Sequence, residues 1–548
     1  MQLREDVMVN RRAVLSSAAA AIALGGFARA SGGSLFQGDA PEGPFLPFWD
    51  SLKAYRTPEW FRDAKLGIWA HWTPQCVPEQ GDWYARNMYI QGMPQYDYHV
   101  KTYGHPSKFG YKDICHLWRA ERWDPEALMR LYKRAGAEYF VAIANHHDNF
   151  DCWNSKHQPW NSVNVGPKRD IVGTWAGIAR THGLRFGVSY HATPHRVWDE
   201  FLPVRYKSDA TGPLAGVPYD GLQTIADGKG TWWEGMDPQL LNGKPHAKNT
   251  PAPEFVRHFL ARLQDLIDSY DPDLLYFDDS ATFDFDAGGP FAPDLKVWLG
   301  MPDLAPQIMA YYLNMNVRRH GGRLDGVLNL KQVPEPVWDT ITRDFEAAME
   351  NSIQKDPWQT DACIGGWHYD RSLLANHAYQ KPSTIIPMFV DIVSKNGNLL
   401  LNIPLPGHGE PDADEMAFLH ELIAWQAVNN EAIKGTRPWK IYGEGPSTSA
   451  KKLGAYQFSA LKFDHRDIRF TTKGDTLYAI VLGWPADGRI DIASLAEGAP
   501  NYPQRIGRIE LLGSHKPVRW RRGPAGLHIE APATPPSKYA CAFRIRPA

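Results

Sequence analysis

Short apolar runs recur along the chain between about residues 60 and 430, and stretches with helical spacing separate them. Strands are predicted for these runs at residues 66–70, 139–144, 186–190, 274–277, 326–330 and 399–403. Each run is continuously apolar rather than alternating, which is typical of parallel strands buried on both faces. The pattern therefore predicts an α/β domain that is built around a parallel sheet.

Helices are predicted between the strands, and two of them carry clear signals. One begins after Asp124, a residue type that caps helices, with Pro125 at the first helical position and Gly136 beyond its end. The other covers residues 253–270, where apolar side chains recur at the helical period. Repeated βα units over this length favour a (β/α)8 (TIM-type) barrel over an open doubly wound sheet. The chain also contains no G-x-G-x-x-G or Walker-type loop, which would support the nucleotide-binding alternative.

The pattern changes in two places along the chain. Residues 192–250 are rich in Gly, Pro and Trp, and the tryptophans favour an ordered, functional insertion over a disordered one. Beyond residue 435, β-type runs such as 475–484 and 508–514 are separated by Gly and Pro turns. We therefore predict a barrel domain at residues 31–435 and a C-terminal β-sandwich at residues 436–548.

The N-terminus has the pattern of a targeting segment rather than of the fold. Arg11 and Arg12 precede an apolar stretch that ends in Ala28-Arg29-Ala30. Paired arginines, an apolar middle and an A-x-A end predict a twin-arginine-type signal peptide at residues 1–30, with an ordinary Sec signal or an N-terminal anchor as alternatives. The predicted location is therefore periplasmic or extracellular.

Composition narrows the class of protein and its partners. The 548 residues are 43% hydrophobic and 22% charged, which is typical of a soluble globular chain. A formal net charge of -2 gives no basic surface for nucleic acid or for an anionic membrane. Beyond the N-terminus no apolar run reaches the length of a membrane span. Five scattered cysteines without a C-x-x-C pair predict neither a zinc knuckle nor a disulfide framework, and we expect buried core thiols.

Ionisable residues follow four of the predicted strands. The first strand is followed by His71, the second by His146 and His147, the third by His191 and the fourth by Asp278. In a barrel the carboxyl ends of the strands surround the active-site mouth, so we expect these side chains to converge. Side chains alternate along a strand, so Asp278 and its neighbour Asp279 cannot both enter the barrel.

Three kinds of chemistry could use such a site. Metal-dependent hydrolysis would favour an H-x-H pair at the first strand, and only one histidine stands there. Sugar hydrolysis needs two carboxyl groups with aromatic faces and hydrogen-bonding groups around the ring, and many of the 21 tryptophans lie near strand ends. A sugar-binding barrel without catalytic activity is the third possibility.

Longer motifs carry a resemblance to a known family. They are "WFRDAKLGIWAHWTP", "GDWYARNMY", "NHHDNFDCWNSKHQPWNSVNVGPKRDIVG", "PWQTDACIGGWHYD" and "DIVSKNGNLLLNIPLPGHG". Together they closely resemble the α-L-fucosidases of glycoside hydrolase family 29, over about residues 45 to 545. The resemblance implies a (β/α)8-like barrel, a C-terminal β-sandwich and retaining hydrolysis of terminal α-L-fucosides, with no metal or organic cofactor.

The resemblance also implies roles for individual residues. Asp278 matches the family's nucleophile, and Asp279 is expected to anchor the following loop. Substrate-binding side chains are implied at His71, Asp82, Trp83, His146 and His147, and at Tyr190 or His191; Trp367, a tryptophan near a strand end, is a further candidate. At one of these positions, Asp82, the family carries a glutamate, and Tyr190 or His191 lies where it often carries an aromatic residue.

The general acid/base is implied at a position that varies within the family. One branch carries Y-E-R-G about a dozen residues before the "PWQTD" motif, which places Glu346 there, with Glu350 and Glu234 as alternatives. Arg343 is expected to orient a carboxylate. The expected substrate is a fucosylated oligosaccharide or glycoconjugate. A related sugar such as an α-L-galactoside is the alternative, because the insertion could reshape the pocket, and the sequence gives no oligomeric state.

Overall fold

The computed structural model describes residues 36, 41–193, 195–245, 253–278, 304–331, 335–449 and 462–548. The predicted signal peptide at residues 1–30 lies outside the described residues, and so does Asp279 with its predicted anchoring role.

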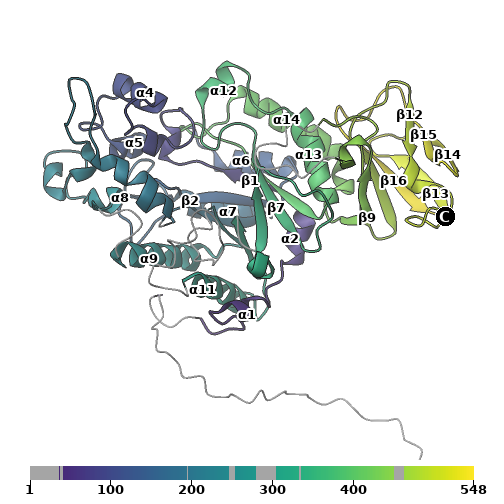
Figure 1. Ribbon diagram of the computed structural model, residues 1–548, viewed down its shortest axis with the longest axis horizontal. Helices are drawn as coiled ribbons and strands as arrows, with labels where there is room; N and C mark the ends of the chain where they lie inside the picture. Colours follow the sequence, from purple (N-terminus) through teal and green to yellow (C-terminus); the bar gives the residue numbers. More distant parts are fainter. Residues whose placement is uncertain are drawn as a thin grey trace, which may run out of the picture. The chain divides into compact units, whose positions relative to one another are not determined.

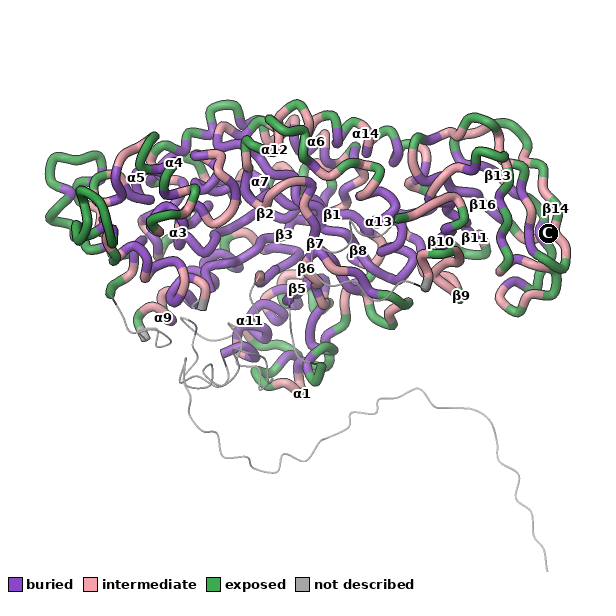
Figure 2. The backbone as a smooth tube through the Cα atoms, turned by 45° about the horizontal axis from the view of Figure 1, so that its top comes forward, coloured by how far each residue is buried: buried purple, intermediate pink, exposed green. Residues whose placement is uncertain are grey.

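Within the described residues, eight parallel strands close into a barrel in the order β1 to β8, which confirms the predicted fold. They are β1 (Leu66–Ala70), β2 (Tyr139–Asn145), β3 (Arg185–Tyr190), β4 (Leu274–Phe277), β5 (Val327–Lys331), β6 (Thr342–Glu346), β7 (Trp358–Cys363) and β8 (Gly397–Asn402). The barrel closes where β1 pairs with β8, with Leu66 opposite Leu399. Most residues of these strands are buried (Figure 2), and β6 alternates between buried and partly exposed residues.

Two strands, β6 and β7, were absent from the prediction because their inner faces are polar. In β6 the buried Asp344 faces the barrel interior, and Glu346 follows it on the same face. In β7 the side chains of Gln359 and Asp361 take the equivalent positions. Alternating polar residues on an inner face do not read as the apolar run of a buried strand.

Helices surround the barrel and connect its strands (Figure 1). The described helices are α1 (Trp49–Leu52), α2 (Glu59–Ala64), α3 (Tyr84–Asn87), α4 (Pro94–Thr102), α5 (Tyr111–Leu117), α6 (Pro125–Arg134), α7 (Ile171–Thr181), α8 (Gln239–Asn242), α9 (Pro253–Tyr270), α11 (Leu304–Arg319), α12 (Arg371–Ala375), α13 (Pro382–Ser394) and α14 (Ala413–Asn429). Helices α6 and α9 confirm the two predicted helices, and the Asp124 side chain caps α6 by accepting a hydrogen bond from the Ala127 amide.

The insertion after β3 folds over α3 and α5 through buried polar contacts. It contains the π-helical turn η2 (His195–Phe201), short 3-10 turns and α8. The Asp220 carboxylate accepts hydrogen bonds from Tyr89 Oη at 2.7 Å and Lys112 Nζ at 2.8 Å. Gly110 lies so close to this carboxylate that a Cβ there would stand 1.8 Å from Asp220 Oδ2. These contacts hold the insertion as an ordered wall beside the strand ends.

The C-terminal part forms two antiparallel sheets that share one apolar core, which confirms the predicted β-sandwich. The first sheet has the order β13-β16-β11-β10-β9, and the second has the order β12-β15-β14. The strands are β9 (Arg437–Glu444), β10 (Ile468–Lys473), β11 (Thr476–Val481), β12 (Arg489–Ile492), β13 (Ile506–Leu511), β14 (Arg519–Gly523), β15 (Gly526–Glu530) and β16 (Cys541–Pro547). The proposed domain boundary at residue 435 falls between α14 and β9.

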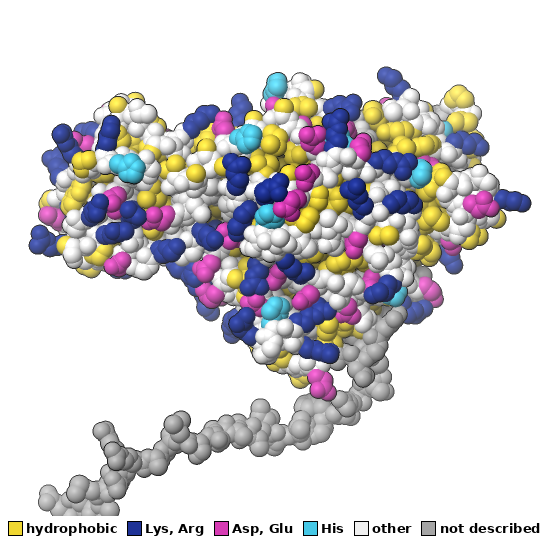
Figure 3. All heavy atoms as spheres, turned by 180° about the vertical axis from the view of Figure 1, so that it is seen from behind, with side chains coloured by type: hydrophobic (Ala, Val, Ile, Leu, Met, Phe, Trp, Pro, Cys, Tyr) yellow, Lys and Arg dark blue, Asp and Glu magenta, His cyan; other side chains and the backbone are white. Residues whose placement is uncertain are grey.

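The cysteines and the surface charges fit the expectations from composition. All five cysteines are free, and all but Cys363 are fully buried. Basic and acidic side chains are interspersed on the face shown in Figure 3, in keeping with the net charge of -2. Among the described residues, no helix combines the length and the apolar character needed to cross a membrane.

Candidate active site

A cavity of about 190 Å³ lies at the carboxyl ends of the barrel strands. Its walls are formed by Trp69, His71, Asp82, Trp83, His146, His147, Arg196, Asp278, Lys331, Glu346 and Trp367. A larger cavity of about 480 Å³ lies at the opposite, amino ends of the strands, where Glu138 and Asp273 precede β2 and β4. We assign the site to the smaller cavity, because ionisable groups from five strand ends converge there and catalytic sites of barrels lie on that side.

The carboxylate of Asp278 lies at the centre of this cavity. Its Oδ1 accepts a hydrogen bond from Lys331 Nζ at 2.7 Å, while Oδ2 lies 3.3 Å from His191 Nδ1 and 3.7 Å from His147 Nε2. Burial alone would raise the pKa of Asp278, but the ammonium group of Lys331, helped by His191, holds that pKa well below its ordinary value. Asp278 is therefore ionised at neutral pH, with 22% of its side chain open to the cavity.

Glu346 approaches the same cation from the neighbouring wall. Its Oε2 lies 3.4 Å from Lys331 Nζ, and its carboxyl group lines the cavity together with Asp278. Each of the two carboxyl groups thus has an oxygen close to the same nitrogen atom, at 2.7 Å for Asp278 and 3.4 Å for Glu346. Two carboxyl groups this close, on two strands of one barrel, suit chemistry that needs two acidic groups at one bond.

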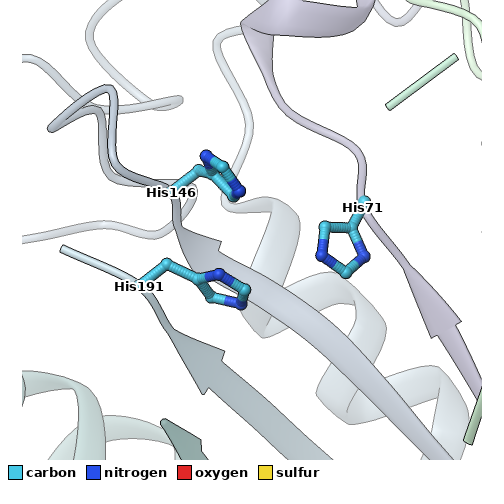
Figure 4. Close-up of side chains that lie close together, drawn as sticks. All are labelled: His71, His146 and His191. Atoms are coloured by element: carbon cyan, nitrogen blue, oxygen red, sulfur yellow. The ribbon is translucent and has the colours of Figure 1, made fainter. Parts of the chain in front are cut away.

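Histidine side chains form the floor of the cavity. Figure 4 shows His71, His146 and His191 at the ends of β1, β2 and β3, with their rings directed toward one another. Their ring nitrogens come within 4.8 Å of one another, which is close enough for a shared metal ion or for a shared network of hydroxyl groups. The hydrogen bonds made by the other nitrogen of each ring distinguish a metal site from a sugar-binding site.

The partners of the histidines fix which nitrogen carries the proton. His71 Nδ1 faces Asn402 Oδ1 at 3.0 Å, and His147 Nδ1 faces the His191 carbonyl oxygen at 2.7 Å, so both rings donate there and leave Nε2 as an acceptor. His146 Nδ1 instead accepts from Gln75 Nε2 at 3.0 Å, which leaves its Nε2–H as a donor. A mixture of acceptors and a donor suits sugar hydroxyl groups, which both donate and accept.

Burial keeps these rings uncharged. It lowers the pKa of His71 and of His146 well below the ordinary value, and neighbouring histidines add to that effect. Burial and His191 lower the pKa of His147 to about 3, although Asp278 acts in the opposite direction. The rings therefore act as neutral hydrogen-bonding groups over the whole physiological range of pH.

The rim of the cavity is built from Asp82, Trp83, Arg196 and Trp367. Asp82 Oδ1 is held by His368 Nδ1 at 2.5 Å. Trp83 has a left-handed backbone with φ of 62°, a conformation that costs energy in a residue with a bulky side chain and is common at functional sites. The Arg196 guanidinium lies 5.6 Å from the centre of the Trp83 indole ring, so the insertion contributes directly to the rim.

Several predicted site residues lie elsewhere. Tyr190 points out of the barrel, where its hydroxyl donates to the Phe259 carbonyl of α9 at 3.2 Å, because the side chains of a strand alternate between its faces. Arg343 also lies on the outer face, where its guanidinium stacks at 4.3 Å on Trp338. The structure therefore does not support a substrate-binding role for Tyr190 or an orienting role for Arg343.

The two alternatives for the acid/base also lie outside the cavity. Glu350 is buried but does not line the cavity. Glu234 is exposed and accepts a hydrogen bond from the Gly230 amide at 3.0 Å within the insertion. Among these three predicted glutamates, Glu346 is the one that lines the cavity with Asp278.

Sequence reasoning missed Lys331 and Arg196. Lys331 is the last residue of β5, one position beyond the predicted strand 326–330, and an ionisable residue at a strand end was the available signal. Arg196 lies in an irregular turn of the insertion, and no sequence pattern placed it at the cavity.

The barrel, the paired carboxyl groups and a small cavity lined by indole rings and neutral imidazoles define a glycoside hydrolase site. Comparison with known proteins identifies the family. The model of the alpha-L-fucosidase family matches residues 37–431, and the model of the alpha-L-fucosidase C-terminal domain matches residues 463–546. The chain belongs to the α-L-fucosidase family, glycoside hydrolase family 29, and is an enzyme of that family.

Individual relatives are similar over nearly the whole chain. Human tissue alpha-L-fucosidase is 26% identical over 516 residues, which cover 92% of this chain and 91% of the relative. The crystal structure of the Thermotoga maritima alpha-fucosidase has a TM-score of 0.65 and 26% identity, and the match covers 91% of this chain and 99% of that one. The fold also matches alpha-L-fucosidase isoenzyme 1 from Paenibacillus thiaminolyticus, with a TM-score of 0.57 and 20% identity over 89% and 98% of the two chains.

Proposed function

We propose that the protein is a retaining exo-α-L-fucosidase in which Asp278 is the nucleophile and Glu346 is the general acid/base. The observation that carries the proposal is the position of Lys331, whose ammonium group contacts both carboxyl groups inside one small cavity. Retaining glycosidases hold their two carboxyl groups about 5 to 5.5 Å apart, and inverting ones about 6.5 to 9.5 Å apart. Contact of both carboxyl groups with the same ammonium nitrogen supports the shorter, retaining separation.

In the first step, Asp278 attacks the anomeric carbon and forms a glycosyl ester. The bond to the leaving oxygen breaks, and the proton of Glu346 moves to that oxygen, so the aglycone leaves as a neutral alcohol. In the second step, Glu346 as a carboxylate takes a proton from water, and the water oxygen attacks the anomeric carbon. The ester bond breaks, Asp278 returns to its carboxylate form and Glu346 regains its proton.

The surrounding side chains position the sugar. Neutral Nε2 acceptors on His71 and His147 and the Nε2–H donor on His146 can bond to hydroxyl groups, while Trp83 and Trp367 offer apolar faces to the ring. A cavity of about 190 Å³ is smaller than typical pockets for drug-sized ligands, so it suits one terminal sugar residue. That size favours removal of a terminal residue over internal cleavage of a fucosylated chain.

Relatives support the choice of substrate. The Thermotoga maritima alpha-fucosidase, 26% identical to this chain, has been solved in complex with fucose and with a mechanism-based inhibitor. We extend fucose recognition from that enzyme to this one. The twin-arginine-type sequence at residues 1–30 supports export, so the natural substrate would be a fucosylated oligosaccharide or glycoconjugate outside the cytoplasm.

The experiment compares purified protein on 4-nitrophenyl α-L-fucoside and on the corresponding α-L-galactoside. We expect a higher kcat/KM on the fucoside. A higher kcat/KM on the galactoside would mean that the enzyme acts on α-L-galactosides by the same mechanism. Asp278→Ala and Glu346→Gln should abolish or strongly reduce turnover, whereas Glu350→Gln, four residues farther on and outside the cavity, should retain it. Binding of fucose without turnover of either glycoside would show a sugar-binding barrel instead.

A further inference from the structure

A chain of buried polar groups runs from the barrel interior to the catalytic carboxyl groups. Tyr276 Oη lies 3.2 Å from Asp344 Oδ1 and 3.1 Å from Asp361 Oδ2. The same Asp361 oxygen lies 2.8 Å from Lys331 Nζ, which continues to Asp278 at 2.7 Å and to Glu346 at 3.4 Å. Asp344 and Asp361 do not line the substrate cavity, so the proposed reaction gives them no task.

The charges of this chain cannot all be present together. Ionisation of Asp278, Glu346, Asp344 and Asp361 would place four negative charges around the one ammonium group of Lys331, two of them fully buried at Asp344 and Asp361. Uncompensated buried charge is so costly that such groups retain protons instead. Some of the four carboxyl groups must therefore be neutral.

The contacts show which of the two deeper groups is ionised. Asp361 receives hydrogen bonds from Lys331 and, at 3.2 Å, from the Ala347 amide. Asp344 Oδ2 accepts from Gln359 Nε2 at 2.6 Å, and no cationic side chain of the described residues contacts Asp344. An acid at 344 can donate to the Tyr276 oxygen while Tyr276 donates to Asp361, which satisfies every group.

The directions of the pKa shifts agree with that assignment. Burial, followed by the neighbouring Asp361, raises the pKa of Asp344 well above its ordinary value. Burial also raises the pKa of Asp361; Lys331 opposes that effect, whereas the neighbouring Glu346 and Asp278 add to it. Burial would lower the pKa of Lys331, but Asp278, Asp361 and Glu346 outweigh it and keep the ammonium group charged.

Asp361 also stands directly beside the proposed general acid. Glu346 of β6 and Asp361 of β7 are in register on adjacent parallel strands, with both side chains on the inner face. Neighbouring strands lie about 4.8 Å apart, and like charges in such positions repel each other. A negative charge at 361 therefore repels a negative charge at 346, and Asp361 competes with Glu346 for Lys331.

We propose that Asp361 is a positioning residue of the reaction, which as a buried carboxylate holds Lys331 and thereby keeps on Glu346 the proton that it donates to the leaving oxygen. Asp344 serves as the neutral acid that completes the hydrogen bonds of Asp361 through Tyr276. This inference rests on the proposed role of Glu346 as the acid/base.

Titratable side chains of the neighbouring strands surround Asp361. The groups that face it are Tyr276 from β4, Asp278 directly after β4, Lys331 from β5, and Asp344 and Glu346 from β6. On β8 its partner in register is the apolar Leu400. Lys331 is the one cation in this set, so removal of the charge at 361 changes how that cation is shared between Asp278 and Glu346.

The experiment measures the pH dependence of kcat/KM for the Asp361→Asn variant. The alkaline limb of the profile reports loss of the proton from the general acid. Without the negative charge at 361, we expect this limb to move to lower pH by about 1 unit. Asp344→Asn is the matched variant, because it replaces a neutral acid by a neutral amide and should leave the alkaline limb in place. The double variant should shift the limb at least as far as Asp361→Asn alone, because Asp344 can then no longer ionise in compensation.

A second readout does not depend on turnover. The infrared difference spectrum of the wild type minus Asp344→Asn at neutral pH should contain the carbonyl band of one protonated carboxylic acid. An alkaline limb that moves in Asp344→Asn and stays in Asp361→Asn would overturn the assignment, and so would a difference spectrum without that band. If Glu346→Gln keeps the wild-type pH profile, the proposed acid/base is wrong, whereas the infrared result on Asp344 stands on its own.

Discussion

Acidification should destabilise the barrel through its buried histidines, and His147 gives the clearest case. The folded protein holds the pKa of His147 at about 3, whereas an unfolded histidine has a pKa of about 6.5. Between these values the unfolded chain binds the proton and the folded chain does not. Stability therefore rises with pH across this window and falls as the pH drops below about 6.5.

The magnitude follows from the two pKa values. At pH 5 an unfolded histidine is almost fully protonated while His147 remains neutral, which costs about 2 kcal/mol of stability. The same sign applies to His71 and His146, whose pKa values are also lowered by burial. Buried acids with raised pKa values, such as Glu415, act in the opposite direction, so only a comparison of variants isolates the contribution of His147.

The assay is urea unfolding, followed by tryptophan fluorescence at pH 7 and pH 5, for the wild type and His147→Asn. The free energy of unfolding of the variant relative to the wild type should increase by about 2 kcal/mol on going from pH 7 to pH 5, because the variant escapes the acid penalty. His515→Asn, at an exposed position of the C-terminal domain, should keep the wild-type pH dependence. An identical pH dependence in wild type and His147→Asn would refute the assignment of a neutral, buried ring at 147.

Three further changes test other parts of the structure. Lys331→Met removes the cation that lowers the pKa of Asp278, so the acid limb of the kcat/KM profile should move to higher pH, and an unmoved limb would contradict that role. Glu346→Gln should slow hydrolysis of fucosides with poor leaving groups by about 100- to 10,000-fold, whereas hydrolysis of fucosyl fluoride should be little affected and added azide should restore turnover. Equal losses on all substrates would argue against an acid/base role. Arg469→Met breaks the buried ion pair with Asp391, in which Arg469 Nε lies 2.6 Å from Asp391 Oδ1. The loss should lower the free energy of thermal unfolding by about 3 kcal/mol, reduced by the remaining contact of Asp391 with Lys395. An unchanged melting temperature would show that the pair adds nothing to stability.

The sequence was sufficient for the parts of the fold in which hydrophobicity alone decides the structure. The apolar strands β1 and β4 begin and end at the predicted residues. Strands β6 and β7 were missed because Asp344, Glu346 and Asp361 face inward, and inward charge becomes tolerable only with a partner such as Lys331 from another strand. Lys331 is 15 residues from Glu346 and 30 residues from Asp361 along the chain, so no local pattern reveals it.

The site residues divide in the same way into those that local sequence predicts and those that depend on tertiary packing. His71, His146 and Asp278 stand directly at strand ends, where the barrel rule places functional groups, and all three line the cavity. Tyr190 also stands at a strand end, but the alternation of side chains turns it toward α9, and only the register of β3 decides that direction. Arg196 is brought to the rim by a turn in the insertion whose packing is entirely tertiary.

The most direct measurement of the central claim is covalent labelling of the protein with 2-deoxy-2-fluoro-α-L-fucosyl fluoride, followed by peptide mapping by mass spectrometry. An intermediate that forms and hydrolyses slowly should be found on the peptide that carries Asp278, at one fucosyl group per chain, and Asp278→Ala should prevent the label. A stable label on any other residue would contradict the account. Hydrolysis of the fluoride by protein that retains Asp278, without any labelled peptide, would contradict it as well.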